Sequence, residues 1–460
     1  MTLLDPADSR PIHFVGIAGA GMSALAELFT LRGMVVTGCD LHPENAADLV
    51  RQGIEVQGLH SPTHVEGARA LVVTSAMPRE HPELARAREL GLPVIRRAEA
   101  LGEVTAGTML VGIAGTHGKS TTTVMTTEAL AAAGLEPTGY VGARVTSWGG
   151  NVRAGGSARF VVEADEYDRS FLALAPTVAV VTNLEADHMD IYADLDDLRR
   201  TFAQFVRGAR YVVLCADDDE ANRIPTPPTA EVIRYGLDSP DARLRAVDLR
   251  REGLGTRFGV VYDGKPLADV TLSVPGHHNV RNALAALAVG LALGVTVPQM
   301  AGGIVAFTGV ERRFQVLGEA GGTLVVDDYA HHPTEVRATI QAARAAAPER
   351  RLVIAFQPHL FSRTRDLARE FGEALAQADV VYLLDVYPSR EQPIAGVTSD
   401  LIARVMHSLG RPPVWQGARE ALAAELSGQV RAGDLVITMG AGDVTRCGRE
   451  ILASLSAGTA

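Results

Sequence analysis

The segment from Met109 to Leu130 reads MLVGIAGTHGKSTTTVMTTEAL. An apolar run leads into a loop with three spaced glycines, then a lysine, a serine and a stretch with the roughly 3.6-residue periodicity of a helix. Glycines let backbone N–H groups point at an anion, and the helix N-terminus adds about half a positive charge. This order predicts a phosphate-binding loop between a buried strand and a helix.

Lysine is rare in this chain, because Lys119 and Lys265 are the only two lysines and the other fixed cations are arginines. A compact ammonium at Lys119 can reach the β- and γ-phosphates of a nucleotide, and the Ser120 hydroxyl can ligate Mg²⁺. Ile113 occupies the place of the first glycine in the common GxxxxGK pattern, so an ordinary glycine-rich turn is the alternative. The expected nucleotide contacts are Gly115, Thr116, His117, Gly118, Lys119, Ser120 and Thr121.

Composition limits the classes of partner and location. The chain has 460 residues, enough for about three domains, and its formal net charge of -11 argues against a nucleic-acid partner. The three cysteines lie far apart and form no CxxC, so neither a disulfide framework nor a zinc site is indicated. The N-terminus lacks the apolar segment of a signal peptide, and we expect a cytoplasmic protein. The uncharged segment from Asn282 to Val310 is interpreted as two buried helices joined near Gly294, not as a membrane span.

The first part of the chain has the pattern of a dinucleotide-binding unit. A strand from Pro11 to Ile17 precedes GAGMSA, a helix to Arg32 and a second strand that ends at Asp40, an acid that can accept ribose hydroxyls. A Rossmann turn that binds nothing is the alternative. The candidate contacts to a nucleotide diphosphate are Gly19, Gly21, Met22, Ser23, Asp40 and, at the end of a later strand, Ser75.

Acidic side chains follow two strands in the second part. The strand RFVVEAD (159–165) carries Glu163 to its carboxyl end, and a strand over 177–183 precedes His188. Beside a phosphate loop such groups could hold Mg²⁺, which prefers a few hard ligands. The alternatives are helix caps or a solvated loop for the acids and a structural role for the histidine.

The remainder of the second part is expected to extend its sheet. Residues 244–275 alternate in polarity around Asp263-Gly264, a hairpin-turn signal, which predicts an antiparallel extension. The helix expected over 276–291 has Asn279 and Asn282 near its start, where they could read a nucleobase edge or merely cap the helix.

The third part alternates cleanly between strands and helices, which predicts a third parallel sheet after a glycine-rich joint at Gly318–Gly322. The turn before Pro333 and the segment PHLFSR would place His331 and Arg363 at a binding edge, although both could be ordinary loop residues. The strands are expected at residues 323–328, 351–356, 379–384 and 434–439.

Taken together, these motifs resemble the Mur ligases of bacterial cell-wall synthesis, and within that family the alanine-adding members. The likeness covers nearly the whole chain, in the order HFVGIAGAGMSALA, GTHGKSTTT, EADEYDRSFL, TNLEADHMD, GHHNVRNALAA, GVERRFQ, DDYAHHPTE, FQPHLFSRT and DVYPSRE. The resemblance implies an α/β fold with three domains. They are a Rossmann-like domain for the UDP-sugar (1–106), a central P-loop-type ATPase domain with a mainly parallel sheet and an antiparallel extension (107–318), and a Rossmann-like domain for the amino acid (319–460).

The resemblance also implies roles for single residues. Lys119 and Ser120 would serve ATP and Mg²⁺, and Glu163 and His188 would be metal ligands. The expected ATP contacts outside the loop are Asn279, Asn282, Arg313 and Asp328. The residues expected to carry catalysis are Lys119, Glu163, His188, His331 and Arg363.

This chain departs from the family pattern at two places. Several members use a carbamylated lysine near a second metal, but no lysine lies between Lys119 and Lys265. Some members have arginine after the histidine of FQPH, where this chain has Leu360. That difference leaves Arg363 as the expected partner of the amino-acid carboxylate.

The activity that the resemblance implies is ATP-dependent ligation. L-Alanine would be joined to the lactyl carboxylate of UDP-N-acetylmuramic acid through an acyl phosphate, with Mg²⁺, in peptidoglycan precursor synthesis. The alternatives are a ligase that adds a murein tripeptide to the same sugar nucleotide, a nicotinamide oxidoreductase and a nucleotide-binding switch protein. Closure of the third domain about Gly318–Gly322 is expected, and the oligomeric state is left open.

Overall fold

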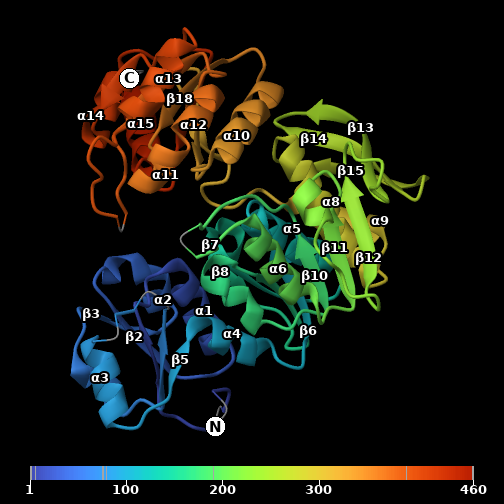
Figure 1. Cartoon of the computed structure of the whole chain (residues 1–460), viewed down its shortest axis with the longest axis vertical. Helices are drawn as coiled ribbons and strands as arrows, with labels where there is room; N and C mark the ends of the chain where they lie inside the picture. The colour runs from blue at the N-terminus through green and yellow to red at the C-terminus, as the bar shows by residue number, and fades with distance from the viewer. Residues whose placement is uncertain are drawn as a thin grey trace. The chain divides into compact units, whose positions relative to one another are not determined.

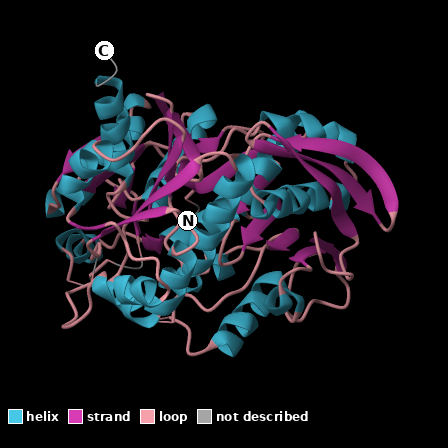
Figure 2. Cartoon of the chain, turned by 90° about the horizontal axis from the view of Figure 1, so that it is seen from above, coloured by secondary structure: helices cyan, strands magenta, loops and turns pink. Residues whose placement is uncertain are grey.

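The computed structural model describes residues 3–5, 7–74, 77–78, 80–189, 191–389 and 391–457. The chain forms two compact units built from sheets with helices packed on them (Figures 1 and 2). The first unit consists of Met1–Asp248, Phe258–Val270 and Arg281–Phe307, and the second of Leu249–Arg257, Thr271–Val280 and Thr308–Ala460.

The first sheet confirms the Rossmann-like expectation. Its five strands are all parallel, in the order β3-β2-β1-β4-β5. Their carboxyl ends therefore share one edge, where ligands of such sheets bind. The strands are β1 (Ile12–Val15), β2 (Val36–Asp40), β3 (Glu55–Gly58), β4 (Ala70–Val73) and β5 (Val94–Arg96). The helices are α1 (Ala20–Leu31), η1 (Pro43–Ala46), α2 (Ala47–Arg51), η2 (Pro62–Val65), α3 (Pro82–Glu89) and α4 (Arg97–Thr105).

The second sheet has ten strands in the order β15-β14-β13-β12-β11-β10-β6-β9-β7-β8. Its strands are β6 (Met109–Ala114), β7 (Thr138–Val145), β8 (Gly150–Arg153), β9 (Arg159–Glu163), β10 (Val178–Val181), β11 (Tyr211–Cys215), β12 (Glu231–Gly236), β13 (Leu244–Glu252), β14 (Gly255–Tyr262) and β15 (Lys265–Leu272). Its helices are α5 (Lys119–Ala132), η3 (Thr146–Trp148), η4 (Tyr167–Ala173), α6 (Leu195–Val206), α7 (Asp219–Asn222), α8 (His277–Ala292) and α9 (Val297–Ala306).

Several predictions for this sheet are confirmed at the level of single turns. Asp263 and Gly264 both have positive φ, 48° and 77°, as a two-residue hairpin between β14 and β15 requires. Helices α8 and α9 are separated at Gly294, and among the described residues no helix is both long and apolar enough to cross a membrane. The antiparallel pairing of β7 with β8 at the opposite edge was not predicted.

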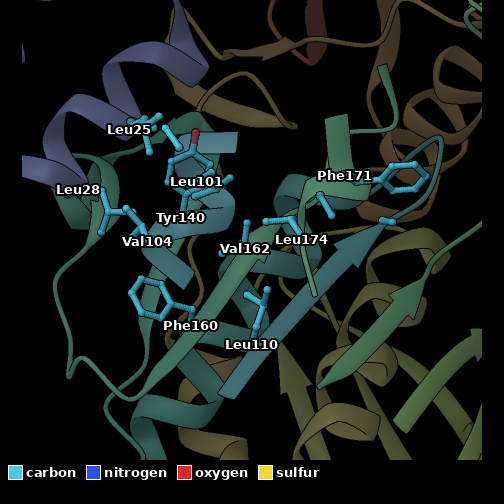
Figure 3. Close-up of a cluster of buried hydrophobic side chains, with 14 of the residues drawn as sticks. Leu25, Leu28, Leu101, Val104, Leu110, Tyr140, Phe160, Val162, Phe171 and Leu174 are labelled. Carbon is cyan, nitrogen blue, oxygen red and sulfur yellow. The ribbon is translucent and has the colours of Figure 1, made fainter. Parts of the chain in front are cut away.

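One hydrophobic core joins the first sheet to the second. Leu25 and Leu28 on α1 and Leu101 and Val104 on α4 point toward Phe160 on β9 and its neighbours (Figure 3). Two polar contacts cross the same junction. The Tyr140 hydroxyl donates a hydrogen bond to the Gly21 carbonyl at 2.8 Å, and the Glu27 carboxylate accepts one from the Asn151 amide at 3.2 Å. The first two expected domains therefore lie together in one compact unit.

The third sheet has six strands in the order β16-β17-β21-β18-β19-β20, and only β16 is antiparallel to its neighbour. The strands are β16 (Gln315–Ala320), β17 (Thr323–Asp328), β18 (Arg351–Phe356), β19 (Val380–Leu384), β20 (Trp415–Gly417) and β21 (Asp434–Met439). The helices are α10 (Pro333–Ala346), α11 (Phe361–Asp366), α12 (Ala368–Leu375), α13 (Asp400–Ser408), α14 (Arg419–Ser427) and α15 (Thr445–Ala457). Successive residues such as Val325 and Val326 enter two different cores, one on each face of the sheet.

The expectation of a joint at Gly318–Gly322 is corrected by the strand pairing. Gly318 lies within β16, and Gly321 and Gly322 form the turn between β16 and β17. Both turn glycines have positive φ, 56° and 74°. A two-residue turn with positive φ favours glycine, because glycine has no Cβ. Gly321 and Gly322 therefore form a tight hairpin turn inside the third sheet, and the segment is not a linker between domains.

Candidate active site

The predicted phosphate loop connects β6 to α5 and is held in place by the segment after β10. The His117 amide donates to Asn183 Oδ1 at 2.8 Å, and the Thr182 hydroxyl donates to the His117 carbonyl at 2.6 Å. Gly115 has a φ of 134°, and a Cβ there would lie 2.1 Å from Thr182 Oγ1. The Thr116 hydroxyl receives a hydrogen bond from the Glu185 amide at 2.9 Å. Only glycine fits at position 115, so this residue and its contacts with the segment after β10 determine the path of the loop.

The ammonium of Lys119 donates hydrogen bonds to carbonyl oxygens of its own loop. Lys119 Nζ donates to the Gly115 carbonyl at 2.7 Å, to the Thr116 carbonyl at 3.1 Å and to the Glu166 carboxylate at 2.9 Å. Burial disfavours the charged ammonium, but the neighbouring carboxylates, Glu166 first among them, outweigh burial and raise the pKa of Lys119. Burial also raises the pKa of Glu166 to about 7. Glu166 was not predicted as the partner of Lys119.

The candidate metal ligands surround this pair. Ser120 and Thr121 lie in the first turn of α5 and are each 7% exposed, and Glu163 ends β9. Glu163 Oε2 accepts a hydrogen bond from the Gly142 amide at 3.0 Å, and a Cβ on Gly142 would lie 3.4 Å from Glu163 Oε1, close to ordinary van der Waals contact. His188 has a φ of 56°, and its Nε2 lies 3.9 Å from Glu166 Oε1.

These observations test whether the donors suit Mg²⁺. Ser120 offers a hydroxyl in the first turn of α5, Glu163 offers a carboxylate at the end of β9, and His188 offers an imidazole whose Nε2 is 3.9 Å from Glu166 Oε1. Mg²⁺ takes hard oxygen ligands and keeps several waters, so a partly open donor set of this kind fits it. We call Lys119, Ser120, Glu163, Glu166 and His188 the phosphate-loop site.

Asn282 belongs beside this site, and Asn279 makes a different contact. A Cβ on Gly118, whose φ is 82°, would lie 2.7 Å from Asn282 Oδ1. The Asn282 amide therefore sits against the glycine that caps α5. Asn279 Nδ2 donates to the Pro275 carbonyl at 2.7 Å, so its amide nitrogen is used within its own turn.

The first glycine loop is arranged around Asp40. Its two carboxylate oxygens accept hydrogen bonds from the Ala18 and His42 amides, each at 2.9 Å. Gly19 is the N-cap of α1, and the Ser23 hydroxyl donates to the Ala20 carbonyl at 3.0 Å. The Met22 side chain is only 2% exposed and lies in the hydrophobic core, so only its backbone faces the loop. Ser75 lies outside the described residues.

Arg97 is a candidate that sequence reasoning missed. It begins α4, and a Cβ on Gly21 would lie 3.0 Å from its Nη1. Its Nη2 lies 3.7 Å from Asp165 Oδ2, two residues beyond Glu163. The guanidinium therefore connects the first glycine loop to the acidic end of β9. No local motif marks this arginine, and only the packing of α4 between the two sheets reveals it.

The second unit holds its own group of predicted residues, at the carboxyl end of β17. Asp328 Oδ2 accepts from the Phe314 amide at 2.7 Å, and Oδ1 accepts from the Ala330 amide at 2.8 Å. Burial raises the pKa of Asp328 to about 6. The Arg313 guanidinium lies 4.9 Å from the centre of the Tyr329 ring.

His331 is next to these groups and is held by its neighbours. Its amide donates to Glu335 Oε2 at 3.0 Å, and its ring meets Tyr329 edge-on with centroids 5.1 Å apart. Burial lowers the pKa of His331 to about 4, and the positive charges of Arg363 and Arg313 act in the same direction. His331 is therefore neutral at neutral pH. We call Arg313, Asp328, His331 and Arg363 the second-unit site.

Three models of Mur ligase domains match successive parts of the chain. A model described as Mur ligase family, catalytic domain, matches residues 11–108, the Mur ligase middle domain matches 113–290, and the Mur ligase, glutamate ligase domain, matches 312–442. The UDP-N-acetylmuramate–L-alanine ligase of Streptomyces avermitilis is 43% identical, over 98% of this chain and 99% of its own length. The enzyme of that name from Desulfatibacillum aliphaticivorans is 43% identical, over 97% of this chain and 98% of its own.

Solved structures give the same grouping. The crystal structure of a UDP-N-acetylmuramate-alanine ligase from Thermotoga maritima superimposes with a TM-score of 0.84 at 28% identity, covering 97% of this chain and 99% of that one. A murein peptide ligase from Psychrobacter arcticus superimposes with a TM-score of 0.71 at 24% identity, covering 97% of this chain and 99% of that one. The second likeness concerns the fold alone.

Proposed function

Since this chain belongs to the Mur ligase family, we propose that it joins L-alanine to the lactyl carboxylate of UDP-N-acetylmuramic acid at the expense of ATP. The observation that carries the proposal is the phosphate loop with Lys119 among carboxylates, in a chain 43% identical over nearly its full length to ligases of that name. The reaction belongs to peptidoglycan precursor synthesis, and a cytoplasmic location remains a prediction.

The chemistry follows from the weakness of a carboxylate as an electrophile. The muramyl carboxylate attacks the γ-phosphorus of ATP, which gives an acyl phosphate and releases ADP. The uncharged amine of L-alanine then attacks the acyl carbon, phosphate leaves, and the amine loses a proton. Lys119 would exchange its Glu166 and carbonyl contacts for phosphate oxygens and neutralise charge on the phosphoryl group in transit. Mg²⁺, when bound by Ser120, Glu163 and His188, supplies further positive charge there.

Each of the remaining predicted residues is assigned to one of the three substrates. The backbone of the first glycine loop and Asp40 would bind the uridine diphosphate, with Arg97 close enough to Gly21 to pair with a phosphate. Asn282, beside Gly118, would contact ATP, and we propose the same for Asn279, Arg313 and Asp328. Arg363 would pair with the alanine carboxylate, since an arginine can bind it with two hydrogen bonds.

Neutral His331 suits an amine substrate. An imidazole with a pKa near 4 carries no charge at neutral pH, so it can accept a hydrogen bond from the attacking amine without repelling it. We therefore propose that His331 orients the amine, with Glu335 fixing the backbone at the same turn.

The alternatives are less favoured. A murein tripeptide ligase would share the fold, but the relatives above with 43% identity carry the alanine name. Hydride transfer by a nicotinamide oxidoreductase would not require a second phosphate-binding loop with Lys119 and the acids beside it. A nucleotide switch would hydrolyse ATP without co-substrates.

Phosphate release tests the function directly. Release should require ATP, UDP-N-acetylmuramic acid and L-alanine together, and omission of either co-substrate should reduce it to background. Replacing L-alanine by glycine should lower kcat/KM by about 10- to 200-fold, the usual discrimination from one methyl group in an apolar pocket. Faster release with the tripeptide than with L-alanine would overturn the proposal, as would co-substrate-independent hydrolysis.

The metal assignment has its own test. Glu163→Gln removes a charged ligand and should raise the Mg²⁺ concentration for half-maximal phosphate release by roughly tenfold or more. Glu231→Gln, at an exposed strand end in the same sheet, is the matched control and should leave the Mg²⁺ dependence unchanged. An unchanged Mg²⁺ dependence in Glu163→Gln would remove Glu163 from the ligand set.

A further inference from the structure

Four potential metal ligands meet inside the first sheet's domain, and none of them is assigned to a substrate above, although Cys39 directly precedes Asp40. They are His13 on β1, Cys39 on β2, His64 in η2 and Glu83 in the first turn of α3. Their ligand atoms all lie within 4.8 Å of one another. His13, Cys39 and Glu83 are at most 1% exposed, and His64 is partly buried. We call these four residues the His–Cys–Glu cluster.

The distances within the cluster suit one small cation. Cys39 Sγ lies 3.1 and 3.2 Å from the two Glu83 oxygens, and His64 Nδ1 lies 2.9 Å from Glu83 Oε1. His13 Nε2 lies 3.7 Å from Glu83 Oε2. Tetrahedral Zn²⁺ bonds of about 2.0–2.3 Å would separate neighbouring ligand atoms by about 3.3–3.7 Å. The separations from Glu83 given above therefore lie within, or a few tenths of an ångström below, the range for zinc ligands.

His13 is oriented as metal-binding histidines are. Its Nδ1 lies 2.9 Å from the Thr37 hydroxyl on the neighbouring strand, while its Nε2 is buried and has no hydrogen-bond partner among the described residues. When Nδ1–H donates to Thr37, the Nε2 lone pair faces the cluster. Metal-bound histidines usually hold their second nitrogen in this way, and a buried unpaired polar atom is otherwise costly.

The charge balance points in the same direction. Glu83 is completely buried, and all its ion-pair partners among the described residues are the histidines His13, His60 and His64. A buried carboxylate usually pairs with a fixed positive charge or coordinates a metal. A divalent cation would compensate Glu83 and a Cys39 thiolate together.

We propose that His13, Cys39, His64 and Glu83 bind one Zn²⁺ ion as a closed structural site. Two imidazoles, a thiolate and a carboxylate form a mixed N, S and O set that favours zinc over Mg²⁺ or Ca²⁺. The ligands come from β1, β2, η2 and α3, so the ion fastens α3 and η2 to one face of the sheet. On binding, the Cys39 thiol loses its proton to solvent.

The wide cysteine spacing concealed this arrangement, because each ligand comes from a different element and no ligand pair has a zinc-motif spacing. The proposal does not depend on the ligase function. The ligands lie on a strand interior, in η2 and in the first turn of α3, not on the phosphate loop.

Cobalt substitution of the untagged full-length chain tests the proposal. Chelator-treated protein should bind one Co²⁺ with tetrahedral ligand-field bands and a thiolate-to-cobalt charge-transfer band, and ZnCl₂ should abolish these bands. Cys39→Ser should remove the charge-transfer band. Cys215→Ser, which replaces another buried free cysteine, is the matched control and should retain it. ATP and MgCl₂ should leave the band unchanged, because the phosphate-loop site contains no cysteine.

A second substitution keeps the proposal testable if Cys39→Ser folds poorly. His64→Gln alters the most exposed member of the cluster and should weaken zinc binding at least about tenfold in competition with a chromophoric chelator. His81→Gln is its comparison, since His81 and His60 form a second group with the same Glu83, and this substitution tests that alternative set while keeping the four proposed ligands. Absence of a charge-transfer band in the folded chain, its persistence in Cys39→Ser or its loss in His81→Gln would each overturn the proposed ligand set.

Discussion

The phosphate-loop site and the second-unit site both remove ionisable groups from water, but they compensate for burial differently. In the first, opposite charges face each other, with Lys119 2.9 Å from the Glu166 carboxylate. In the second, burial lowers the pKa of His331 to about 4, and two backbone amides hold the Asp328 carboxyl. Pairing keeps Lys119 charged in the first site, whereas in the second burial keeps His331 neutral and backbone amides bind the Asp328 carboxyl.

This difference in how charge is stabilised matches the proposed ligand of each site, a triphosphate at the first and an amine at the second. A paired ammonium can leave its carboxylate for a triphosphate, because phosphate oxygens offer a stronger set of negative charges. An amine nucleophile must be uncharged to attack, and a neutral imidazole can accept a hydrogen bond from it without adding a positive charge beside it. The comparison therefore separates a site whose ammonium is held by pairing with a carboxylate from a site whose imidazole is held neutral by burial.

The largest effect is expected when the charge is removed from the first site. Lys119→Ala should lower kcat/KM for phosphate release by about 10³-fold, or about 4 kcal/mol, because no other cation on the loop can replace the ammonium. Binding of UDP-N-acetylmuramic acid, measured by calorimetry, should stay within about twofold, since that ligand is assigned to the first glycine loop. Lys265→Ala, at the exposed start of β15, changes the chain's other lysine and should leave both measurements unaltered. Loss of sugar-nucleotide binding in Lys119→Ala would contradict this division.

A smaller, pH-dependent effect is expected in the second site. The folded-state pKa of His331 is about 4, below its value of about 6.5 in an unfolded chain, so its contribution to stability is present above pH 6.5 and is lost as pH falls toward 4. One fifth of the side chain is exposed, and we expect the loss to be about 2 kcal/mol. His331→Gln should remove this part of the acid sensitivity.

The measurement can be confined to the second unit. Trp148 and Trp415 are the only tryptophans, so Trp415 fluorescence in a Trp148→Phe background reports denaturant unfolding of that unit. The exposed His407→Gln variant should keep the wild-type pH dependence. An identical acid profile for His331→Gln and the parent would show that His331 is not held neutral by burial.

The smallest effect is expected from the backbone contacts of the second site. Asp328→Asn keeps the size of the side chain but leaves one acceptor oxygen for two amides, so it should cost about 1 kcal/mol of unfolding free energy at pH 7. Asp385→Asn, on an exposed residue after β19, should change the same fluorescence transition by less than about 0.5 kcal/mol. Equal effects of the two substitutions would mean that the Phe314 and Ala330 contacts do not contribute.

Much of the fold was predictable because its signals are local. Strand β6 and helix α5 lie where the apolar run and the glycine loop indicated, and β17, β18 and β21 have the expected bounds. Pro333 begins α10, as its fixed φ and missing N–H favour. The prediction of a domain joint at Gly318–Gly322 was wrong, because glycines are equally common in hairpin turns and in linkers.

The sequence by itself determined which segments are strands, turns and helices, and which residues begin or end them. Those properties depend on periodicity, on φ and on side chains a few residues apart. Only the tertiary structure decided which distant groups meet. It paired Lys119 with Glu166, set Arg97 against Gly21 and brought Cys39 to Glu83. These contacts connect different elements, and their formation depends on how helices and sheets pack, which no local pattern specifies.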